Sequence, residues 1–484
     1  MVTIEIRKNS LFEEGEFSYD LKTLSGNFFP NKKCKIELRK DWEKRTDYPI
    51  RITINKSIVM DTALDPYDKE KVKREVYNSF SEYTHSVLPW GILTGIRPAK
   101  IAYSLLDELG SRQEAFEVLM DDYLLYQQKA ELALDVAANE HLLTDGLNLK
   151  DGYSVYIGIP FCPSICEYCS FSSYPIERYQ DSVGDYLDAL EKELLFIDRF
   201  IHSHRVKREL HSVYVGGGTP TSLSPSDLKR LMGMIRENVP IDGDTEFTVE
   251  AGRPDSITKE KLEILKESGV KRLSINPQSM LPETLKRLGR THTAAQVREA
   301  FRLARECGIE NINMDLIVGL PEEDEVDFYN TLNQVYDLGP DSITVHTLVI
   351  KRASRLRREQ METGGDIRPE DTLIPVLQKG SYDYLKEHGY EPYYMYRQKN
   401  ALGSSRNTNQ ENVAYARLGK ECLYNVLMME DLEDILAFGS GGASKKMFRG
   451  SGRIKRVENV KSVEDYIKRI DEMIARKQEV FDGT

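Results

Sequence analysis

Cysteine is scarce in this chain, with six in 484 residues, and three of the six (Cys162, Cys166 and Cys169) lie within eight positions. Long apolar stretches are missing too, since no run approaches the ~18 apolar residues of a membrane-spanning helix. The first residues lack the basic and then apolar pattern of a secretion signal. We therefore expect a cytoplasmic protein without a membrane span, in which structural disulfides are rare.

Positive charge is in deficit. The formal net charge is −12 and the isoelectric point is about 5.4. A protein that binds duplex nucleic acid usually carries a basic face, so this balance argues against nucleic acid as a partner. With 40% apolar and 30% charged residues the composition predicts a globular chain. The length predicts two or three domains.

From residue 153 onward short apolar strands alternate with amphipathic helices. The apolar pattern predicts a helix capped by Ser224 and another that starts with a capping box between Thr293 and Gln296. Six successive βα units predict an α/β fold with a parallel sheet, an open and partial (β/α)6 barrel of the TIM type. The expected strands are 154–161, 211–218, 245–252, 272–279, 311–319 and 342–349.

The pattern of apolar and polar residues changes twice along the sequence, which predicts three domains. Residues 1–148 contain the strand-like segments 34–40 and 50–56 and a helical segment at 69–84, and are expected to form an α+β accessory domain. Residues 149–390 are expected to form the barrel core. Residues 391–484, aromatic and polar at first, are expected to form a C-terminal cap and substrate domain.

The three clustered cysteines follow the first barrel strand and have the spacing CxxxCxxC. Thiolates bind zinc, copper(I) and iron–sulfur clusters. A structural zinc site needs a closed set of four ligands, whereas this motif supplies three and has no second pair downstream. Three cysteines can hold a cubane cluster and leave one iron open. The ligand count therefore favours an iron–sulfur cluster over zinc.

Other chemically active residues also fall at the ends of the expected strands. "GGGTPT" (216–221) ends the second strand, Glu250 the third and Gln278 the fourth, and Asp315 lies in the fifth. Glycines let a backbone approach the charged groups of a ligand, although a glycine run by itself more often marks a tight turn. The active site of a barrel lies at this end of its strands.

The cysteine spacing in a loop after strand one resembles the signature of the S-adenosylmethionine (SAM) radical superfamily. The resemblance implies that Cys162, Cys166 and Cys169 hold a 4Fe–4S cluster whose open iron binds SAM. One electron from the cluster would cleave SAM to a 5′-deoxyadenosyl radical, and the glycine turn would receive the SAM amino group. Clusters of this kind reach potentials down to about −700 mV, so a flavodoxin or ferredoxin is implied as electron donor.

A closer resemblance rests on "YIGIPFC", "CEYC", "GGGTPTSL", "VEAGRPD", "NPQSM…LGRTH" and "MDLIVGLP". These motifs resemble the oxygen-independent coproporphyrinogen III dehydrogenase-like family, in the long divergent branch with an extra N-terminal domain. The resemblance implies an oxidoreductase of porphyrin and haem biosynthesis. Its substrate would be a tetrapyrrole, coproporphyrinogen III, whose two propionates become vinyl groups to give protoporphyrinogen IX.

The resemblance also assigns residues. Tyr156 and Gly217 would line the first SAM, and Glu250 would hold its ribose or amino group. A second SAM would contact Tyr168, Gly218, Thr219, Gln278, Arg290 and Asp315. Glu250, Gln278, Arg290 and Asp315 are the expected catalytic residues. Substrate carboxylates need cationic partners, for which the candidates are Lys351, Arg352, Arg355, Arg397, Lys399 and Arg406.

Three positions depart from the family's patterns. Phe171 stands where the dehydrogenases carry a further cysteine, Gly158 replaces a usual histidine, and Tyr424–Asn425 replaces the His–Asn pair of the haem-chaperone relatives. Two alternative hypotheses therefore stay open. One is a haem-binding, chaperone-like relative without dehydrogenase activity. The other is a radical SAM enzyme with another substrate; RNA is disfavoured by the acidic balance.

Overall fold

The computed structural model describes residues 1–7, 16–30, 32–39, 42, 49–64, 68–169, 173–203, 207–348, 373–397, 411–448 and 453–481. The chain divides into two compact units. One comprises Met1–Ala138, Glu370–Lys379 and Met395–Asn412, and the other Asn139–Pro369, Gly380–Tyr394 and Val413–Thr484. The three-part division expected from the sequence stays a prediction. Within the described ranges, no helix is long and apolar enough to cross a membrane.

The first unit begins with a four-stranded sheet in the order β2-β1-β3-β4, in which β1 is parallel to β2 and antiparallel to β3. The expected strands at 34–40 and 50–56 and the expected helix at 69–84 are confirmed as β2, β3 and α3. The elements are β1 (Val2–Arg7), α2 (Glu16–Phe28), β2 (Cys34–Arg39), β3 (Pro49–Ile54), β4 (Ser57–Ala63), α3 (Lys69–Thr84), α4 (Ala99–Leu109), α5 (Arg112–Asp121) and α6 (Gln127–Thr144), the last reaching into the second unit.

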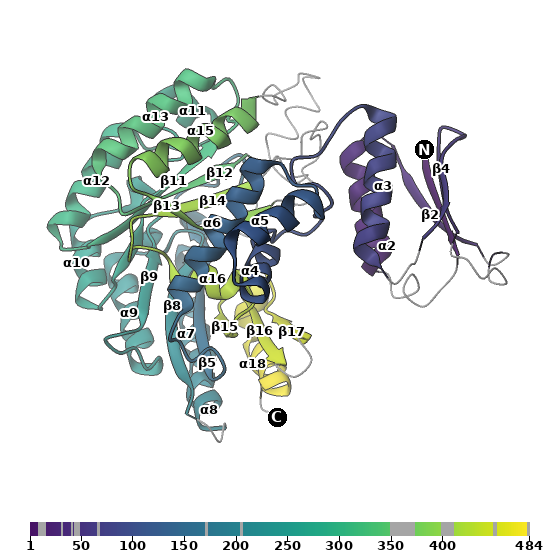
Figure 1. Cartoon of the computed structure of the whole chain (residues 1–484). Helices are drawn as coiled ribbons and strands as arrows, with labels where there is room; N and C mark the ends of the chain where they lie inside the picture. Colours follow the sequence, from purple (N-terminus) through teal and green to yellow (C-terminus); the bar gives the residue numbers. More distant parts are fainter. Residues whose placement is uncertain are drawn as a thin grey trace. The chain divides into compact units, whose positions relative to one another are not determined.

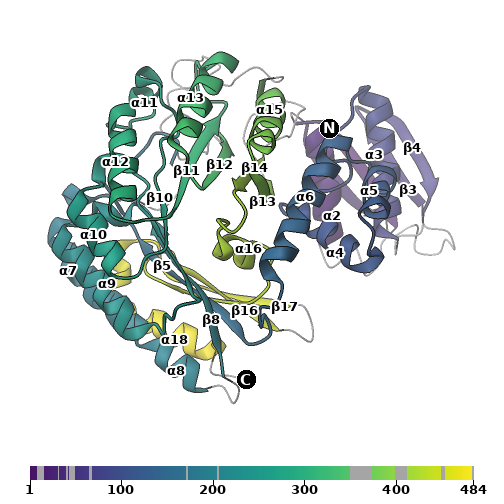
Figure 2. The same ribbon diagram turned by 60° about the vertical axis from the view of Figure 1, so that its left-hand side comes forward.

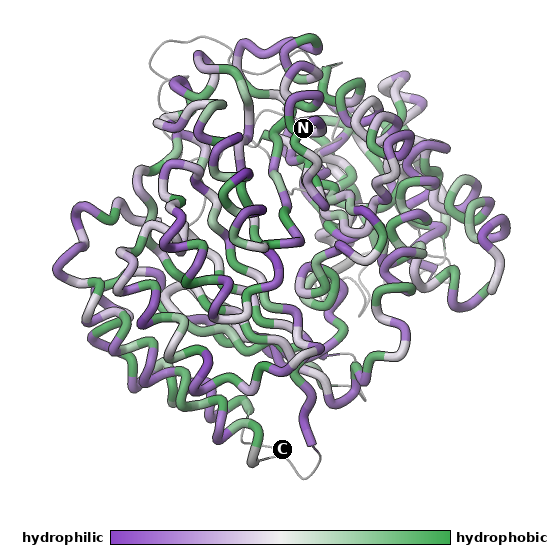
Figure 3. Tube along the Cα trace, turned by 90° about the vertical axis from the view of Figure 1, so that its left-hand side faces the viewer, coloured by the Kyte–Doolittle hydropathy of each residue, from purple (hydrophilic) through white to green (hydrophobic). Residues whose placement is uncertain are grey.

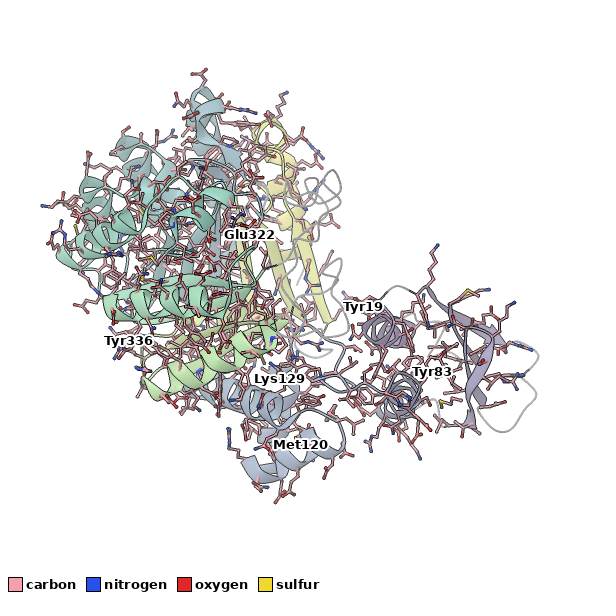
Figure 4. The ribbon with its side chains drawn as sticks, turned by 90° about the horizontal axis from the view of Figure 1, so that it is seen from above. Tyr19, Tyr83, Met120, Lys129, Glu322 and Tyr336 are labelled. Atoms are coloured by element: carbon pink, nitrogen blue, oxygen red, sulfur yellow. The ribbon has the colours of Figure 1, made fainter. Side chains whose placement is uncertain are left out.

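Alternation along β1 builds the core of this sheet. Val2, Ile4 and Ile6 are buried on one face, as the two-residue period of a strand requires. Helices α2 and α3 cover that face, and the rings of Phe28 and Phe80 meet edge to face with centroids 5.7 Å apart. Figure 4 shows the two helices side by side, with Tyr19 labelled on α2 and Tyr83 on α3.

The second sheet has eleven strands in the order β13-β14-β12-β11-β10-β9-β8-β5-β15-β16-β17. Its six central strands run parallel to one another and confirm the predicted α/β fold with a partial barrel (Figure 1). They are β5 (Gly152–Ile159), β8 (Glu209–Gly217), β9 (Glu246–Glu250), β10 (Arg272–Ser274), β11 (Asn311–Val318) and β12 (Ser342–Thr347).

Helices between these strands form an outer row, which is clearest in Figure 2. Ser224 caps α9 by accepting from the Asp227 N–H, and Thr293 and Gln296 form the predicted capping box of α12. Along the outer helices purple and green alternate in Figure 3, as expected for amphipathic helices. The row comprises α7 (Gln180–Leu194), α8 (Phe196–Ser203), α9 (Pro225–Asn238), α10 (Lys259–Glu267), α11 (Pro282–Arg287), α12 (Ala294–Glu306) and α13 (Glu325–Leu338).

Residues beyond 390 add strands at both ends of the sheet, which the sequence did not predict. Strand β15 lies parallel to β5, and β14 lies antiparallel to β12. Strands β14 and β15 are buried along their whole length, so they lack the alternation that marks a half-exposed strand. The remaining elements are α15 (Leu373–Glu387), β13 (Glu391–Arg397), β14 (Glu411–Ala416), α16 (Leu423–Met429), β15 (Asp434–Phe438), β16 (Ala443–Phe448), β17 (Arg453–Glu458), α17 (Val463–Lys468) and α18 (Ile470–Phe481).

A buried ion pair fastens the C-terminal helix α18 to α7. Lys477 and Glu193 are both fully buried, and the Lys477 ammonium donates to Glu193 Oε1. The second carboxylate oxygen of Glu193 accepts from Tyr466 at 2.6 Å and from the Gly439 N–H at 2.9 Å. The carboxylate therefore ties α17, α18 and the turn after β15 to one helix of the barrel.

A second buried polar group joins β15 to the start of the barrel. Glu433, next to β15, contacts His211 Nδ1 on β8 and accepts from the Ser154 hydroxyl on β5. Glu209 lies 3.8 Å from the other ring nitrogen. Burial opposes charge on the imidazole, but the two carboxylates outweigh it, and the pKa of His211 is raised.

Candidate functional site

The three clustered cysteines lie on the loop that leaves β5. Cys162 belongs to the short strand β6 (Phe161–Cys162), which pairs with β7 (Tyr174–Pro175). The next two are linked by a turn in which the Cys169 N–H donates to the Cys166 carbonyl at 3.0 Å. All three thiols are free of disulfides. Burial raises the pKa of Cys162 to about 11, and a hydrogen bond with Thr219 partly opposes that shift.

This donor set fits an iron–sulfur cubane. The part of the chain that the structure describes holds no group of three or more His, Cys, Asp or Glu side chains close enough to bind a single metal ion. A cubane does not need such convergence, because each thiolate binds a different iron. Hydroxyl groups lie near two of the sulfurs, Thr219 at 3.5 Å from Cys162 and Ser173 at 3.7 Å from Cys169.

The glycine turn after β8 is hydrogen-bonded to the cysteine loop. The Gly218 N–H donates to the Ile159 carbonyl at 2.8 Å, and the Thr219 N–H to the Phe161 carbonyl at 2.7 Å. A Cβ on Gly218 would lie 2.6 Å from Phe161 O, so only glycine permits this approach. Gly217 has φ +107° and donates its N–H to Glu250. A ligand at this turn therefore meets no free N–H of Gly217 or Gly218.

Glu250 ends β9 beside a stack of three tyrosine rings. Tyr214 donates its hydroxyl to Oε1, and the Gly217 N–H donates to Oε2 at 3.2 Å. Tyr214 stacks on Tyr424 with centroids 4.7 Å apart and on Tyr156 at 6.2 Å. Burial raises the pKa of Glu250, although the Tyr214 hydrogen bond opposes that shift. The site thus presents an oriented carboxyl group against an aromatic wall.

Two buried arginines connect the cysteine loop to the ends of the next strands. Arg290 Nη1 donates to the Tyr168 hydroxyl at 3.0 Å, and Nη2 to the Gly252 carbonyl at 3.1 Å. Arg253 Nη1 donates to the Ser164 hydroxyl at 2.9 Å. Tyr168 in turn packs against Leu288 and its apolar neighbours. These contacts fix the loop that carries Cys166.

Gln278, beyond the end of β10, and Asp315, on β11, occupy neighbouring positions. The expected strand 272–279 ends at Ser274, and Gln278, at φ +67°, rejoins the sheet through a single bridge to Leu316. Its N–H donates to the Asp315 carbonyl at 2.9 Å. Burial would raise the pKa of Asp315, but hydrogen bonds from His346, Asn313 and Thr344 outweigh it, so the pKa is lowered. His346 Nε2 lies 3.5 Å from the carboxylate.

The residues expected to bind the cluster and SAM all lie in the described part of the chain, at or near the ends of the parallel strands. The sequence did not single out Tyr214, Arg253 and His346, whose contacts join segments far apart in sequence. Arg253 was inside a recognised motif, "VEAGRPD", and was the easiest of these to find. Phe171 and the basic candidates Lys351, Arg352, Arg355, Lys399 and Arg406 lie outside the described residues.

Arg397 is the one basic candidate that the structure describes, and its side chain is buried. It donates to the Leu93 carbonyl at 2.6 Å and lies 5.5 Å from the Trp90 ring centre. Burial lowers its pKa to about 10. The motif "LPWGILTGIRP" therefore provides a packing site for this guanidinium.

The sequence profile of the radical SAM superfamily matches residues 156–335. The chain is 39% identical over 422 residues to the oxygen-independent coproporphyrinogen-III oxidase-like protein HemZ of Bacillus subtilis, covering 86% of this chain and 82% of that one. It is 33% identical over 316 residues to the heme chaperone HemW of the same organism, covering 65% and 76%. The solved structure of coproporphyrinogen III oxidase (HemN) from Escherichia coli superposes with a TM-score of 0.53 at 23% identity, covering 69% and 72%, and shows the shared fold.

A partial barrel with this cysteine loop and glycine turn defines a radical SAM protein. Within that superfamily, the chain belongs to the oxygen-independent coproporphyrinogen III oxidase-like family. The family expected from the sequence motifs is confirmed. Membership of the superfamily implies a 4Fe–4S cluster and SAM.

Proposed function

We propose that this protein is an oxygen-independent coproporphyrinogen III dehydrogenase. The observation that carries the proposal is the placement of Cys162, Cys166 and Cys169 on one loop that is hydrogen-bonded to the glycine turn, beside Glu250. The similarity to the oxidase-like relative supports it, because that similarity extends over 86% of this chain.

The proposed roles follow from the geometry. The three cysteines would hold the cluster, and Tyr156, Gly217 and Glu250 would hold SAM against it. Tyr214 keeps the Glu250 carboxyl group oriented, and the stacked rings exclude water from that side. When bound, the cluster and SAM supply a carbon radical that removes one hydrogen atom from a propionate side chain.

Each propionate becomes a vinyl group by loss of a hydrogen atom, carbon dioxide and one electron. The electron requires a one-electron acceptor, of the iron–sulfur or flavin class. Gln278, Arg290 and Asp315 line the neighbouring strand ends and are assigned to a second SAM, and a tetrapyrrole with four carboxylates would lie beyond them. A flavodoxin or ferredoxin would deliver the electron that reduces the cluster.

Anaerobic reconstitution tests the proposal. The reduced protein with SAM and coproporphyrinogen III should release 5′-deoxyadenosine and the divinyl product, both measured by chromatography. Cys166→Ala should abolish both products and reduce the iron content. Cys307→Ala, which changes a cysteine outside the loop, should retain both. A loaded wild-type protein that forms neither product would refute the dehydrogenase.

A second candidate is a haem carrier that keeps SAM as a bound ligand, favoured by the 33% identity to the heme chaperone. Against it, the position of the chaperones' histidine is occupied by Tyr424, whose ring is buried in the tyrosine stack. Stoichiometric haem binding, with a shifted Soret band and without the divinyl product, would favour the carrier.

A further inference from the structure

Cys166 differs from the other two cysteines of the loop in its neighbours. Arg253 Nη1 lies 3.7 Å and Arg290 Nη1 lies 3.9 Å from its sulfur, and both contacts have hydrogen-bond geometry. The two arginines are only 2% and 6% exposed. By contrast, Cys162 and Cys169 make their side-chain hydrogen bonds with the hydroxyl groups of Thr219 and Ser173. Both arginine hydrogen bonds therefore go to one of the three thiols, Cys166.

All three nitrogens of the Arg253 guanidinium form hydrogen bonds, which hold the group in place. Nε and Nη2 form a bidentate pair with Asp255 at 3.0 and 2.8 Å, and Nη2 also donates to Thr291 at 3.1 Å. Nη1 is shared between Ser164 and the Cys166 sulfur. Such a rigid fork cannot swing away from the loop, so the donor stays at the sulfur.

Arg290 approaches the same sulfur from the turn after α11. Its two terminal nitrogens also donate to Tyr168 and to the carbonyls of Gly252 and Asn276. Its Nε is buried and has no hydrogen-bond partner among the described residues. Asp255 forms its ion pair with Arg253 and acts on Arg290 only as a weaker, more distant charge. The charge of Arg290 is thus less compensated than that of Arg253.

We propose that Arg253 and Arg290 set the reduction potential of the cluster through Cys166, an inference that rests on the proposed function because it requires the cluster. Reduction adds one negative charge to the cluster. Buried cations and N–H···S hydrogen bonds stabilise that added charge, and both are known to tune such potentials. The arginine pair therefore makes the cluster easier to reduce, and Asp255 partly offsets its effect.

Redox titration of the reconstituted protein, followed by the electron paramagnetic resonance of the reduced cluster, tests the inference. Arg253→Gln should make one-electron reduction at least about tenfold less favourable, which equals a shift of 59 mV to more negative potential. Asp255→Asn should shift the potential in the opposite direction, because Arg253 then keeps its charge uncompensated. Arg302→Gln, on the exposed face of α12, should leave the potential unchanged.

The iron and sulfide contents separate this inference from the proposed function. Variants that hold a full cluster and have the wild-type reduction potential would overturn the role assigned to the arginines, without affecting the proposed dehydrogenase function. Shifts of the same sign in Arg253→Gln and Asp255→Asn would also overturn it, since both would then report a loosened loop. If Arg253→Gln holds no cluster, Asp255→Asn decides alone. A wild-type chain without a cluster overturns both proposals.

Discussion

The hydroxyl group of Tyr214 on β8 donates to the carboxylate of Glu250 on the adjacent strand β9. The two residues are neighbours only because β8 and β9 pair in parallel. With the Gly217 N–H on the other oxygen, both oxygens of the carboxylate are oriented before any ligand arrives. Preorganisation of this kind is expected to strengthen ligand binding.

Tyr214→Phe therefore should weaken SAM binding without unfolding the protein. One hydrogen bond to a carboxylate is worth about 1.5–3 kcal/mol, so we expect the SAM dissociation constant to rise about tenfold or more in calorimetric titration. Tyr390→Phe is the matched control, because it removes a buried hydroxyl that donates to the Pro340 carbonyl at 2.6 Å, away from the site. Equal affinity in the two variants would contradict the role of Tyr214.

Gly218→Ala should disrupt the hydrogen-bonded contact between the glycine turn and the cysteine loop. The added Cβ would lie 2.6 Å from Phe161 O and 2.9 Å from Ile159 O. Such overpacking costs about 1–3 kcal/mol, and we expect a lower iron content after reconstitution. Gly233→Ala in α9 meets no atom within 4 Å and should stabilise the chain by about 1 kcal/mol. A normal iron content in Gly218→Ala would show that cluster binding does not depend on the close contact between the glycine turn and the cysteine loop.

Lys477→Met should be strongly destabilising, because it leaves the Glu193 carboxylate buried without its cation. Breaking such a pair costs about 3–5 kcal/mol, to be measured by chemical denaturation. Glu193→Gln combined with Lys477→Met should recover part of this loss. Arg302→Gln breaks exposed pairs with Glu299 and Glu306 and should cost less than about 1 kcal/mol. A similar small loss in Lys477→Met would show that Glu193 is not dependent on the ion pair.

His211 should make stability fall as the pH rises. Its pKa is raised by Glu433 and Glu209, above the value of about 6.5 expected in the unfolded chain. The stabilisation is therefore fully present below about pH 6.5 and is lost as the pH rises through the raised value. Thermal unfolding from about pH 6 to about pH 9 should show this decline in the wild type. In His211→Gln the same range should give a flatter profile, and parallel profiles would rule out His211 as the source.

Periodicity and helix caps were enough to predict the six central strands and the starts of α9 and α12. Spacing was enough to find the cysteine loop. Arg253 was not singled out because its contact with the cysteine loop is to the sulfur of Cys166, 87 positions away in the sequence. Strand β15 was not predicted because it is buried on both faces and pairs with β5, about 280 residues earlier in the sequence. The contact between Ser154 and Glu433 has a similar sequence separation of 279 residues. Neither relationship leaves a local pattern.

The pairing of β15 with β5 also has a consequence for biosynthesis. Strand β5, which leads into the cysteine loop, stays an open edge until Asp434–Phe438 have been made. At ~5–20 residues per second, the 279 positions from Ser154 to Glu433 take roughly 15–55 s to translate. During that time β5 can pair with β8 on one side, but its other edge is unpaired and apolar, the kind of edge that recruits other strands. Ribosome-bound chains that stop short of residue 434 are therefore expected to depend on chaperones.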